Sequence, residues 1–177
     1  LLMVTPYYNK TSQAGLIKHY STIAANVSTP IILYNVPSRT GVNILPATYK
    51  ALSELPLINA VKEANGNIAS VAETISLCGD ELNVYSGNDD QILPIVALGG
   101  QGVISVLSHV APRQTHDMVM EYKKGNVEKA RQLQIEYFDL CKDLFCDVNP
   151  IPVKAAMNMM GWDVGECRLP LTGLSEA

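Results

Sequence analysis

Short apolar runs alternate with amphipathic segments through the first 106 residues, and this alternation constrains the fold more than any other feature. The apolar runs are predicted strands, and they cover residues 1–4, 31–34, 57–62, 82–85 and 102–106. Segments with helical spacing separate them, at residues 13–26, 46–55, 67–77 and 92–98. Strands that are joined through helices pair in parallel. The sequence therefore predicts an α/β fold built on a parallel sheet.

Residues that favour caps and turns mark the ends of these segments. Ser12 and Asn67 are expected to cap helices, because their short side chains accept hydrogen bonds from free amides of the first turn. Pro46 suits the first turn of a helix, and Gly79 is expected to end one. Residues 35–41, NVPSRTG, contain both proline and glycine and are predicted to form a loop.

The pattern changes near Ala111, where the alternation stops. Three helices are predicted from there, over residues 112–123, 127–145 and 151–160. We therefore expect two regions. Residues 1–110 contain the alternation of strands and helices, and residues 111–177 form a helical appendage.

Composition excludes several classes of function. With 177 residues, 47% of them hydrophobic, and a net charge of -4, the chain has enough apolar material for a globular core. It has no basic stripe for nucleic acid and no apolar run of membrane-spanning length, so neither partner is expected. The four cysteines lack metal-ligand spacing, which predicts reduced thiols in the cytoplasm and no metal site. Three histidines are expected to be structural: His19, His109 and His116.

Lys62 closes the apolar run of the third predicted strand. The carboxyl ends of parallel strands face the ligand in α/β folds. Desolvation disfavours the ammonium form of a partly buried lysine, and a neutral amine attacks a ketone to form a Schiff base. The alternative is a surface lysine at the end of a strand.

Further chemistry-bearing residues follow the other predicted strands. A tyrosine hydroxyl beside such a lysine relays protons, an arginine holds a carboxylate through two hydrogen bonds, and a glycine admits a small ligand. The alternatives are tyrosines that only cover the core edge and a solvated arginine. The glycines at 99, 100 and 102 precede a strand, which argues against a phosphate-binding loop. The candidate residues are Tyr7, Tyr8, Tyr34, Arg39, Gly87 and Ile104.

Six motifs carry a resemblance to a known family. In chain order they are VTPYYNK, ILYNVPSRTG, AVKEANGN, YSGNDD, GGQGVISV and NPIPVK. In this order and spacing they resemble the 4-hydroxy-tetrahydrodipicolinate synthase (dihydrodipicolinate synthase) family of pyruvate-dependent class I aldolases. The resemblance implies a (β/α)8 TIM barrel with extra carboxy-terminal helices, assembled as a dimer of dimers. Residues 1–110 are then part of the catalytic barrel, and residues 111–177 are its final helix and a carboxy-terminal helical extension. It also implies a lyase of lysine and diaminopimelate biosynthesis that needs no metal and no organic cofactor.

The resemblance assigns the catalytic roles to three residues. Lys62 matches the lysine that forms the Schiff base with pyruvate, and Tyr34 matches the proton-relay tyrosine. Tyr8 matches the tyrosine that reaches across the tight dimer interface into the partner's active site.

Four further residues match binding positions of the family. Arg39 matches the residue that binds the carboxylate of L-aspartate-4-semialdehyde, and it is the mark of the synthase branch. Gly87 and Ile104 match residues that line the pyruvate pocket. Tyr7 matches a tyrosine near the interface site where lysine inhibits many members.

The chain departs from the family pattern in its length. A (β/α)8 barrel takes about 200–250 residues, whereas only five strands are predicted here. We expect a barrel that lacks its first three βα units, and with them the paired threonines of the family. The isolated chain is then expected to be inactive. Two alternatives stay open: a sibling aldolase such as N-acetylneuraminate lyase, against which Arg39 argues, and an inactive fragment with only an assembly role.

Overall fold

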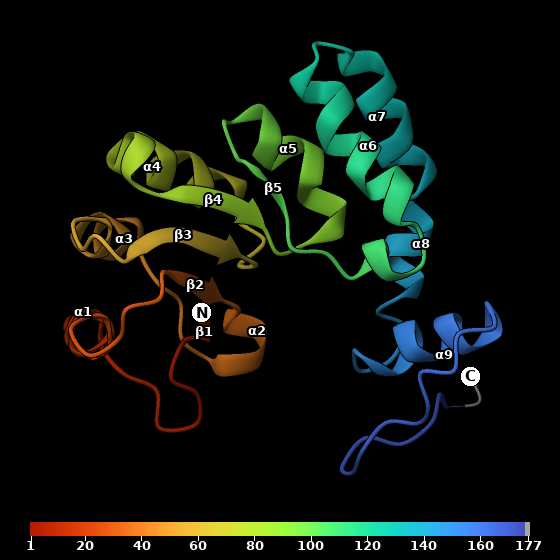
Figure 1. Cartoon of the computed structure of the whole chain (residues 1–177), viewed down its shortest axis with the longest axis horizontal. Coiled ribbons are helices and arrows are strands. Elements are labelled where there is room, and N and C mark those ends of the chain that lie inside the picture. Colours follow the sequence, from red (N-terminus) through yellow and green to blue (C-terminus); the bar gives the residue numbers. More distant parts are fainter. Residues whose placement is uncertain (176–177) are drawn as a thin grey trace. The chain divides into compact units, whose positions relative to one another are not determined.

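The computed structural model describes residues 1–175 and divides them into two compact units, one of residues 1–104 and one that begins at Ser105. The first unit contains a single five-stranded sheet (Figure 1). Its strands are β1 (Leu2–Val4), β2 (Ile31–Asn35), β3 (Ile58–Glu63), β4 (Asn83–Ser86) and β5 (Gly102–Val103). The predicted α/β class is confirmed.

All neighbouring strands of the sheet pair in parallel, and their order in space is β1-β2-β3-β4-β5. Doubly wound sheets reverse direction at a switch point, whereas barrels keep the strands in chain order. Crossovers of one hand then place every connecting helix on the same face. The strand order is therefore that of the βα repeat of a (β/α)8 barrel, as predicted.

The connecting helices of the first unit begin and end at the expected signals. They are α1 (Gln13–Ala24), α3 (Pro46–Ser53), α4 (Ile68–Cys78) and α5 (Ile92–Ala97), with short 3-10 turns η1 (Gly79–Glu81) and η2 (Asp89–Gln91). The Ser12 side chain accepts a hydrogen bond from the Gly15 amide at 3.2 Å, and Asn67 accepts one from the Ser70 amide at 3.1 Å. Both predicted N-caps are confirmed.

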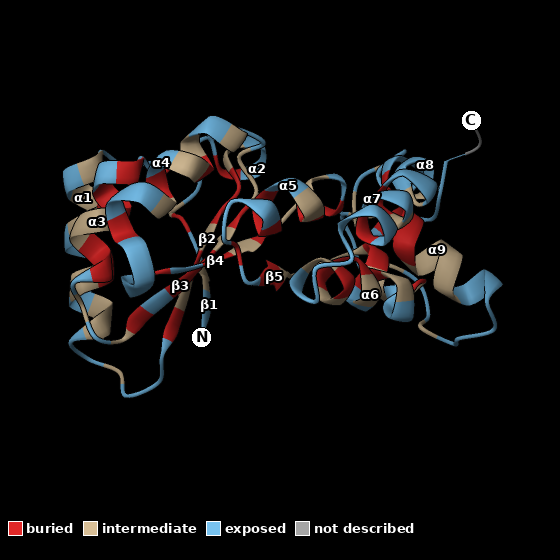
Figure 2. Cartoon of the chain, turned by 90° about the horizontal axis from the view of Figure 1, so that it is seen from above, coloured by how far each residue is buried: buried red, intermediate tan, exposed pale blue. Residues whose placement is uncertain are grey.

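The core lies between the sheet and these helices, where Figure 2 shows buried residues on the facing sides. Leu33, Val61 and Val84 project from three adjacent strands at matching register. They pack with fully or nearly fully buried side chains of the helices: Leu16, Tyr20, Tyr49, Leu52, Val71, Cys78 and Ile95. Burial of this apolar surface, at about 25 cal/mol per Å², stabilises the sheet with its helices on one face.

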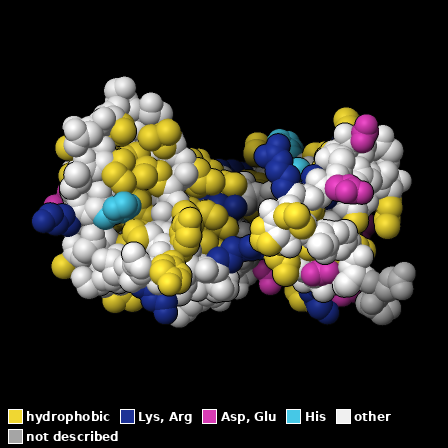
Figure 3. Space-filling view, turned by 90° about the horizontal axis from the view of Figure 1, so that it is seen from below, with side chains coloured by type: hydrophobic (Ala, Val, Ile, Leu, Met, Phe, Trp, Pro, Cys, Tyr) yellow, Lys and Arg dark blue, Asp and Glu magenta, His cyan; other side chains and the backbone are white. Residues whose placement is uncertain are grey.

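The other sheet face and the β1 edge are less covered. Leu2 is 50% exposed and Val4 is 38% exposed, so β1 presents apolar side chains at the edge of the sheet in this unit. Figure 3 shows hydrophobic side chains gathered on one surface of the unit that contains the sheet. An edge strand of this kind offers free backbone groups and apolar side chains to further pairing.

Two predicted segments of the first unit are corrected. Residues 37–40 form a short helix, α2 (Pro37–Thr40), within the expected loop. Pro37 presets the first turn, and Gly41 ends the helix at φ 69°, in the left-handed region. The fifth strand is shorter than the predicted 102–106, because the chain turns into a 3-10 helix, η3 (Leu107–His109).

The second unit is helical, with α6 (Pro112–Lys123), α7 (Val127–Glu136), α8 (Phe138–Asp143) and α9 (Ile151–Met159). The prediction of one helix over residues 127–145 is wrong. Tyr137 separates α7 from α8, because its ψ of 5° turns the chain out of regular α-helix.

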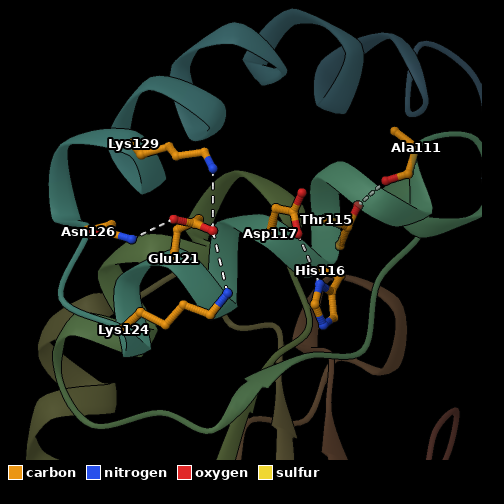
Figure 4. A network of polar contacts seen from close by, with 8 residues as sticks. All are labelled: Ala111, Thr115, His116, Asp117, Glu121, Lys124, Asn126 and Lys129. Carbon is orange, nitrogen blue, oxygen red and sulfur yellow. Dashed lines mark hydrogen bonds and ion pairs between the residues drawn. The ribbon is translucent and has the colours of Figure 1, made fainter.

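A polar cluster joins α6 to α7 (Figure 4). The Glu121 carboxylate accepts a hydrogen bond from the Asn126 amide at 2.8 Å and lies 3.4 Å from the Lys129 ammonium and 3.7 Å from that of Lys124. Glu121 is 8% exposed, so this carboxylate needs its partners. The cluster holds the turn between the two helices.

Within residues 1–175, no helix is long and apolar enough to cross a membrane. The same residues contain no group of three or more histidine, cysteine or acidic side chains arranged to hold a metal ion. His19 lies in α1, His109 in η3 and His116 in α6, where its Nδ1 is 3.1 Å from the Asp117 carboxylate.

Candidate active site

The candidate site lies on the sheet face that the helices leave uncovered. The register places Val4, Tyr34, Lys62 and Tyr85 side by side on β1 to β4. Successive side chains of a strand point to opposite faces, so the residue that follows each of them faces the helices. Tyr34 and Lys62 are therefore direct neighbours near the carboxyl ends of their strands.

Lys62 and Tyr34 are in contact. The Lys62 ammonium lies over the Tyr34 ring, 4.4 Å from its centroid, which is the geometry of a cation–π interaction. Both side chains are half-buried. The pair can thus be reached by a small molecule while its surroundings are partly dry.

Electrostatics favour a reactive amine at Lys62. Burial lowers the pKa of the Lys62 ammonium, because desolvation disfavours its charge, and the positive charge of Arg39 lowers it further. The negative charge of Asp89 opposes this by raising the same pKa. A lysine whose pKa is lowered has a larger neutral fraction at a given pH, and the neutral form is the nucleophile.

Burial also raises the pKa of the Tyr34 phenol, while the charge of Arg39 lowers it. The phenol therefore stays protonated at neutral pH and can donate its proton. A hydroxyl in this state, beside an amine that attacks a carbonyl, can pass protons to and from the reacting oxygen.

Arg39 is exposed and projects from the four-residue helix α2. Its backbone is held in place because the Thr40 hydroxyl donates to the Val36 carbonyl at 3.2 Å and accepts from the Val42 amide, also at 3.2 Å. Its charge acts on both Tyr34 and Lys62, so it belongs to the same electrostatic environment. An arginine in this position can bind the carboxylate of an incoming substrate.

Gly87 and Ile104 extend the sheet ladder beyond the ends of β4 and β5. The Gly87 amide donates to the Glu63 carbonyl at 2.7 Å, and the Ile104 amide donates to the Ser86 carbonyl at 2.9 Å. A Cβ at position 87 would lie 2.7 Å from the Ala64 Cβ. Only glycine fits this close approach without a shift of its neighbours.

The two tyrosines after β1 are largely exposed. Tyr7 is 68% exposed and Tyr8 is 89% exposed, on the loop between β1 and α1. Tyr8 has φ 62° and Lys10 has φ 57°, which is an uncommon region for residues other than glycine. The roles that the resemblance gives to Tyr7 and Tyr8 stay predictions.

The sequence reasoning missed a second set of polar residues at the strand ends. They face the helices, one position after the site residues, and are almost fully buried: Thr5, Asn35, Glu63 and Ser86. It also missed Asp89, which is 4% exposed and acts on Lys62. Strict period-two alternation beyond the apolar run would have placed Asn35 and Glu63 on the helix side.

Comparison with known proteins gives one consistent result. A synthase from Caldicellulosiruptor saccharolyticus, 4-hydroxy-tetrahydrodipicolinate synthase, is 60% identical over 99% of this chain and 59% of its own length. A solved dihydrodipicolinate synthase from Acinetobacter baumannii, complexed with pyruvate, is 41% identical with a TM-score of 0.95, covering 99% of this chain and 60% of the other.

A second solved synthase, from Cyanidioschyzon merolae with lysine bound, is 41% identical with a TM-score of 0.94 and covers 98% of this chain and 59% of the other. This chain therefore spans about 60% of the length of the relatives it matches. The model of the dihydrodipicolinate synthetase family matches residues 1–177. With the expected strand order and the neighbouring lysine and tyrosine, this match shows that the chain belongs to the dihydrodipicolinate synthetase family.

Proposed function

We propose that the protein that contains this chain condenses pyruvate with L-aspartate-4-semialdehyde to give 4-hydroxy-tetrahydrodipicolinate, in lysine and diaminopimelate biosynthesis. The observation that carries the proposal is that the half-buried Lys62 amine contacts the Tyr34 ring, while burial lowers the pKa of this amine. The choice of reaction is supported by the relative named 4-hydroxy-tetrahydrodipicolinate synthase and by the relative solved with pyruvate.

The first half of the reaction forms a nucleophile from pyruvate. The neutral Lys62 amine attacks the ketone carbon, the oxygen leaves as water, and a protonated imine forms. This imine withdraws electrons, so the pyruvate methyl group loses a proton and an enamine results. Tyr34 is the proposed donor and acceptor of these protons, consistent with a phenol that stays protonated at neutral pH.

The second half joins the two substrates. The enamine carbon attacks the aldehyde carbon, which restores the imine. The amine of the semialdehyde then attacks the imine carbon, closes the ring and displaces the Lys62 amine. Arg39 is the proposed partner of the semialdehyde carboxylate, and Gly87 and Ile104 are the proposed walls of the pyruvate pocket.

The remaining assignments come from the family. Tyr8 is proposed to act in the site of a partner subunit in a dimer of dimers, which its 89% exposure leaves it free to do. Lysine is proposed to bind near Tyr7, supported by the relative solved with lysine. The cytoplasm is the proposed compartment, supported by four cysteines that form no disulfide among residues 1–175.

Reductive trapping tests the proposal. The protein, expressed from its complete coding sequence, is incubated with pyruvate and borohydride, and digested peptides are analysed by mass spectrometry. A reduced pyruvate adduct is expected on Lys62 and on no other lysine. Lys62→Met should abolish the adduct, while the matched exposed variant Lys18→Met should leave it unchanged. An adduct elsewhere, or none on the intact protein, contradicts the proposal.

A further inference from the structure

Glu63 is a buried carboxylate that the proposed mechanism does not use. It is 4% exposed and directly follows Lys62 in β3, so it points into the helix-covered side of the sheet. A buried carboxylate is costly unless its oxygens are hydrogen-bonded.

Three donors from three segments meet the Glu63 carboxylate. The Asn35 side-chain amide of β2 donates at 3.0 and 3.2 Å to its two oxygens, and the Tyr49 hydroxyl of α3 donates at 2.8 Å. The Asn65 backbone amide, in the turn after β3, donates at 2.8 Å. Glu63 thus ties two neighbouring strand ends to the helix that covers them.

Asn35 extends this network to the segment that carries Arg39. Its amide nitrogen also donates to the Asn43 side-chain oxygen at 2.8 Å, and its own oxygen accepts from the Ile44 amide at 3.1 Å. The chain between Asn35 and Asn43 contains α2 and therefore Arg39. Both ends of this segment are held by one fully buried side chain.

The geometry points to Glu63, Asn35 and Tyr49 as a positioning network for the proposed Schiff-base site. The inference rests on the proposed function. Asn35 pairs with Glu63 in the same register in which Tyr34 pairs with Lys62, one residue earlier on each strand. The hydrogen bond between Asn35 and Glu63 therefore also fixes the spacing of Tyr34 and Lys62 on the opposite face. The same contacts fix the ends of the Arg39 segment.

Electrostatics show how tightly the network depends on its donors. Burial raises the pKa of the Glu63 carboxyl, and the hydrogen bonds from Tyr49 and Asn35 act against this rise. Burial and the neighbouring Glu63 both raise the pKa of the Tyr49 phenol, so the phenol keeps the proton that it donates. Removal of one donor leaves the carboxylate less well accommodated and the strand ends less firmly joined.

The test measures the rate of pyruvate trapping on Lys62 in the protein expressed from its complete coding sequence. Tyr49→Phe removes one donor and keeps the ring in the core. Thr74→Val is the matched control, because it removes a buried hydroxyl that donates to the Ser70 carbonyl at 2.9 Å in α4, away from the strand ends. Thermal unfolding is recorded for both variants, so that stability and trapping can be compared.

We expect Tyr49→Phe to trap pyruvate on the order of tenfold more slowly and to lower kcat, since small misplacements of reacting groups have large effects on rate. Thr74→Val should trap at the normal rate. A normal trapping rate in Tyr49→Phe overturns the inference. Absence of any adduct on the unmodified protein is a different result, because it contradicts the proposed function itself.

A second pair of variants separates position from charge. Glu63→Gln keeps the shape and one acceptor oxygen, and its amide can donate to the Tyr49 hydroxyl, so trapping should stay within about threefold of normal. Glu63→Leu removes every acceptor and should trap on the order of tenfold more slowly, or more slowly still. An equal loss in both variants contradicts a positioning role, because it would mean that the carboxylate charge acts on Lys62.

Discussion

The two faces of the sheet carry different kinds of side chain at the same strand ends. On the open face, Tyr34 and Lys62 are half-buried and in contact with each other. On the helix-covered face, Asn35 and Glu63 are almost fully buried and bonded to several segments. One face thus leaves polar groups available for a substrate, and we infer that the polar groups of the other face hold the first in place.

The largest effect is expected from a cavity on the helix-covered face. Leu33 is fully buried in the core, and Leu33→Ala should lower the free energy of unfolding by about 2–5 kcal/mol. Leu77, on the exposed side of α4, offers the matched control, and Leu77→Ala should cost much less. Denaturant unfolding measures both. Similar losses would mean that this face does not carry the stability of the unit.

On the open side, Arg39→Ala should act on substrate use and leave stability almost unchanged. Loss of a charged contact to the semialdehyde carboxylate should cost about 2 kcal/mol of kcat/KM for aspartate semialdehyde. Pyruvate trapping on Lys62 should survive. Steady-state kinetics with both substrates check this, with Lys18→Ala as an exposed-cation control. Equal loss of both activities would identify Arg39 as a structural residue.

Gly87→Ala should affect both faces at once. The added Cβ would meet the Ala64 Cβ at 2.7 Å and the Glu63 carbonyl oxygen at 3.0 Å, so the strand ends must shift. A destabilisation on the order of 1 kcal/mol is expected, together with slower pyruvate trapping. Gly66→Ala is a useful control, because its added Cβ has no atom within 4 Å outside the adjacent residues, although its φ of 77° adds strain. Unchanged trapping in Gly87→Ala would show that this spacing is not critical.

The smallest expected effect is a shift in pH dependence. Asp89 raises the pKa of the Lys62 ammonium, so Asp89→Asn should lower that pKa further. The neutral amine then appears at lower pH, and the pH profile of pyruvate trapping should move in the acid direction. Asp90→Asn, at an exposed neighbouring position, should leave the profile unmoved. A shift toward higher pH would contradict the assigned sign.

Much of the fold could be predicted from the sequence, because it depends on local signals. The alternation of strands and helices, the caps at Ser12 and Asn67 and the helix over 112–123 follow from periodicity and cap chemistry. The predictions for segments 37–40 and 127–145 are wrong. A four-residue helix contains little more than one turn of 3.6 residues, which is too short to show a periodic pattern, and the turn at Tyr137 has no distinct sequence signal.

The site was predictable in part for the same reason. Lys62 and Tyr34 end apolar runs, so their location near the carboxyl ends of strands could be expected. Their contact depends on the register between β2 and β3, which tertiary packing decides. The role of Glu63 was hidden, because a charged residue after an apolar run usually marks the point where a strand reaches solvent.

The register of β3 also restricts how this part of the gene can change. Lys62 and Glu63 are adjacent in sequence but serve opposite faces. Insertion or deletion of one residue within β3, before Lys62, would exchange the faces of these two residues. It would place the Glu63 carboxylate on the open face and the Lys62 ammonium in the core. Substitutions here can be tested one at a time, but a change in length alters both faces together. We therefore expect length variants of this strand to fail even where single substitutions at its other positions are tolerated.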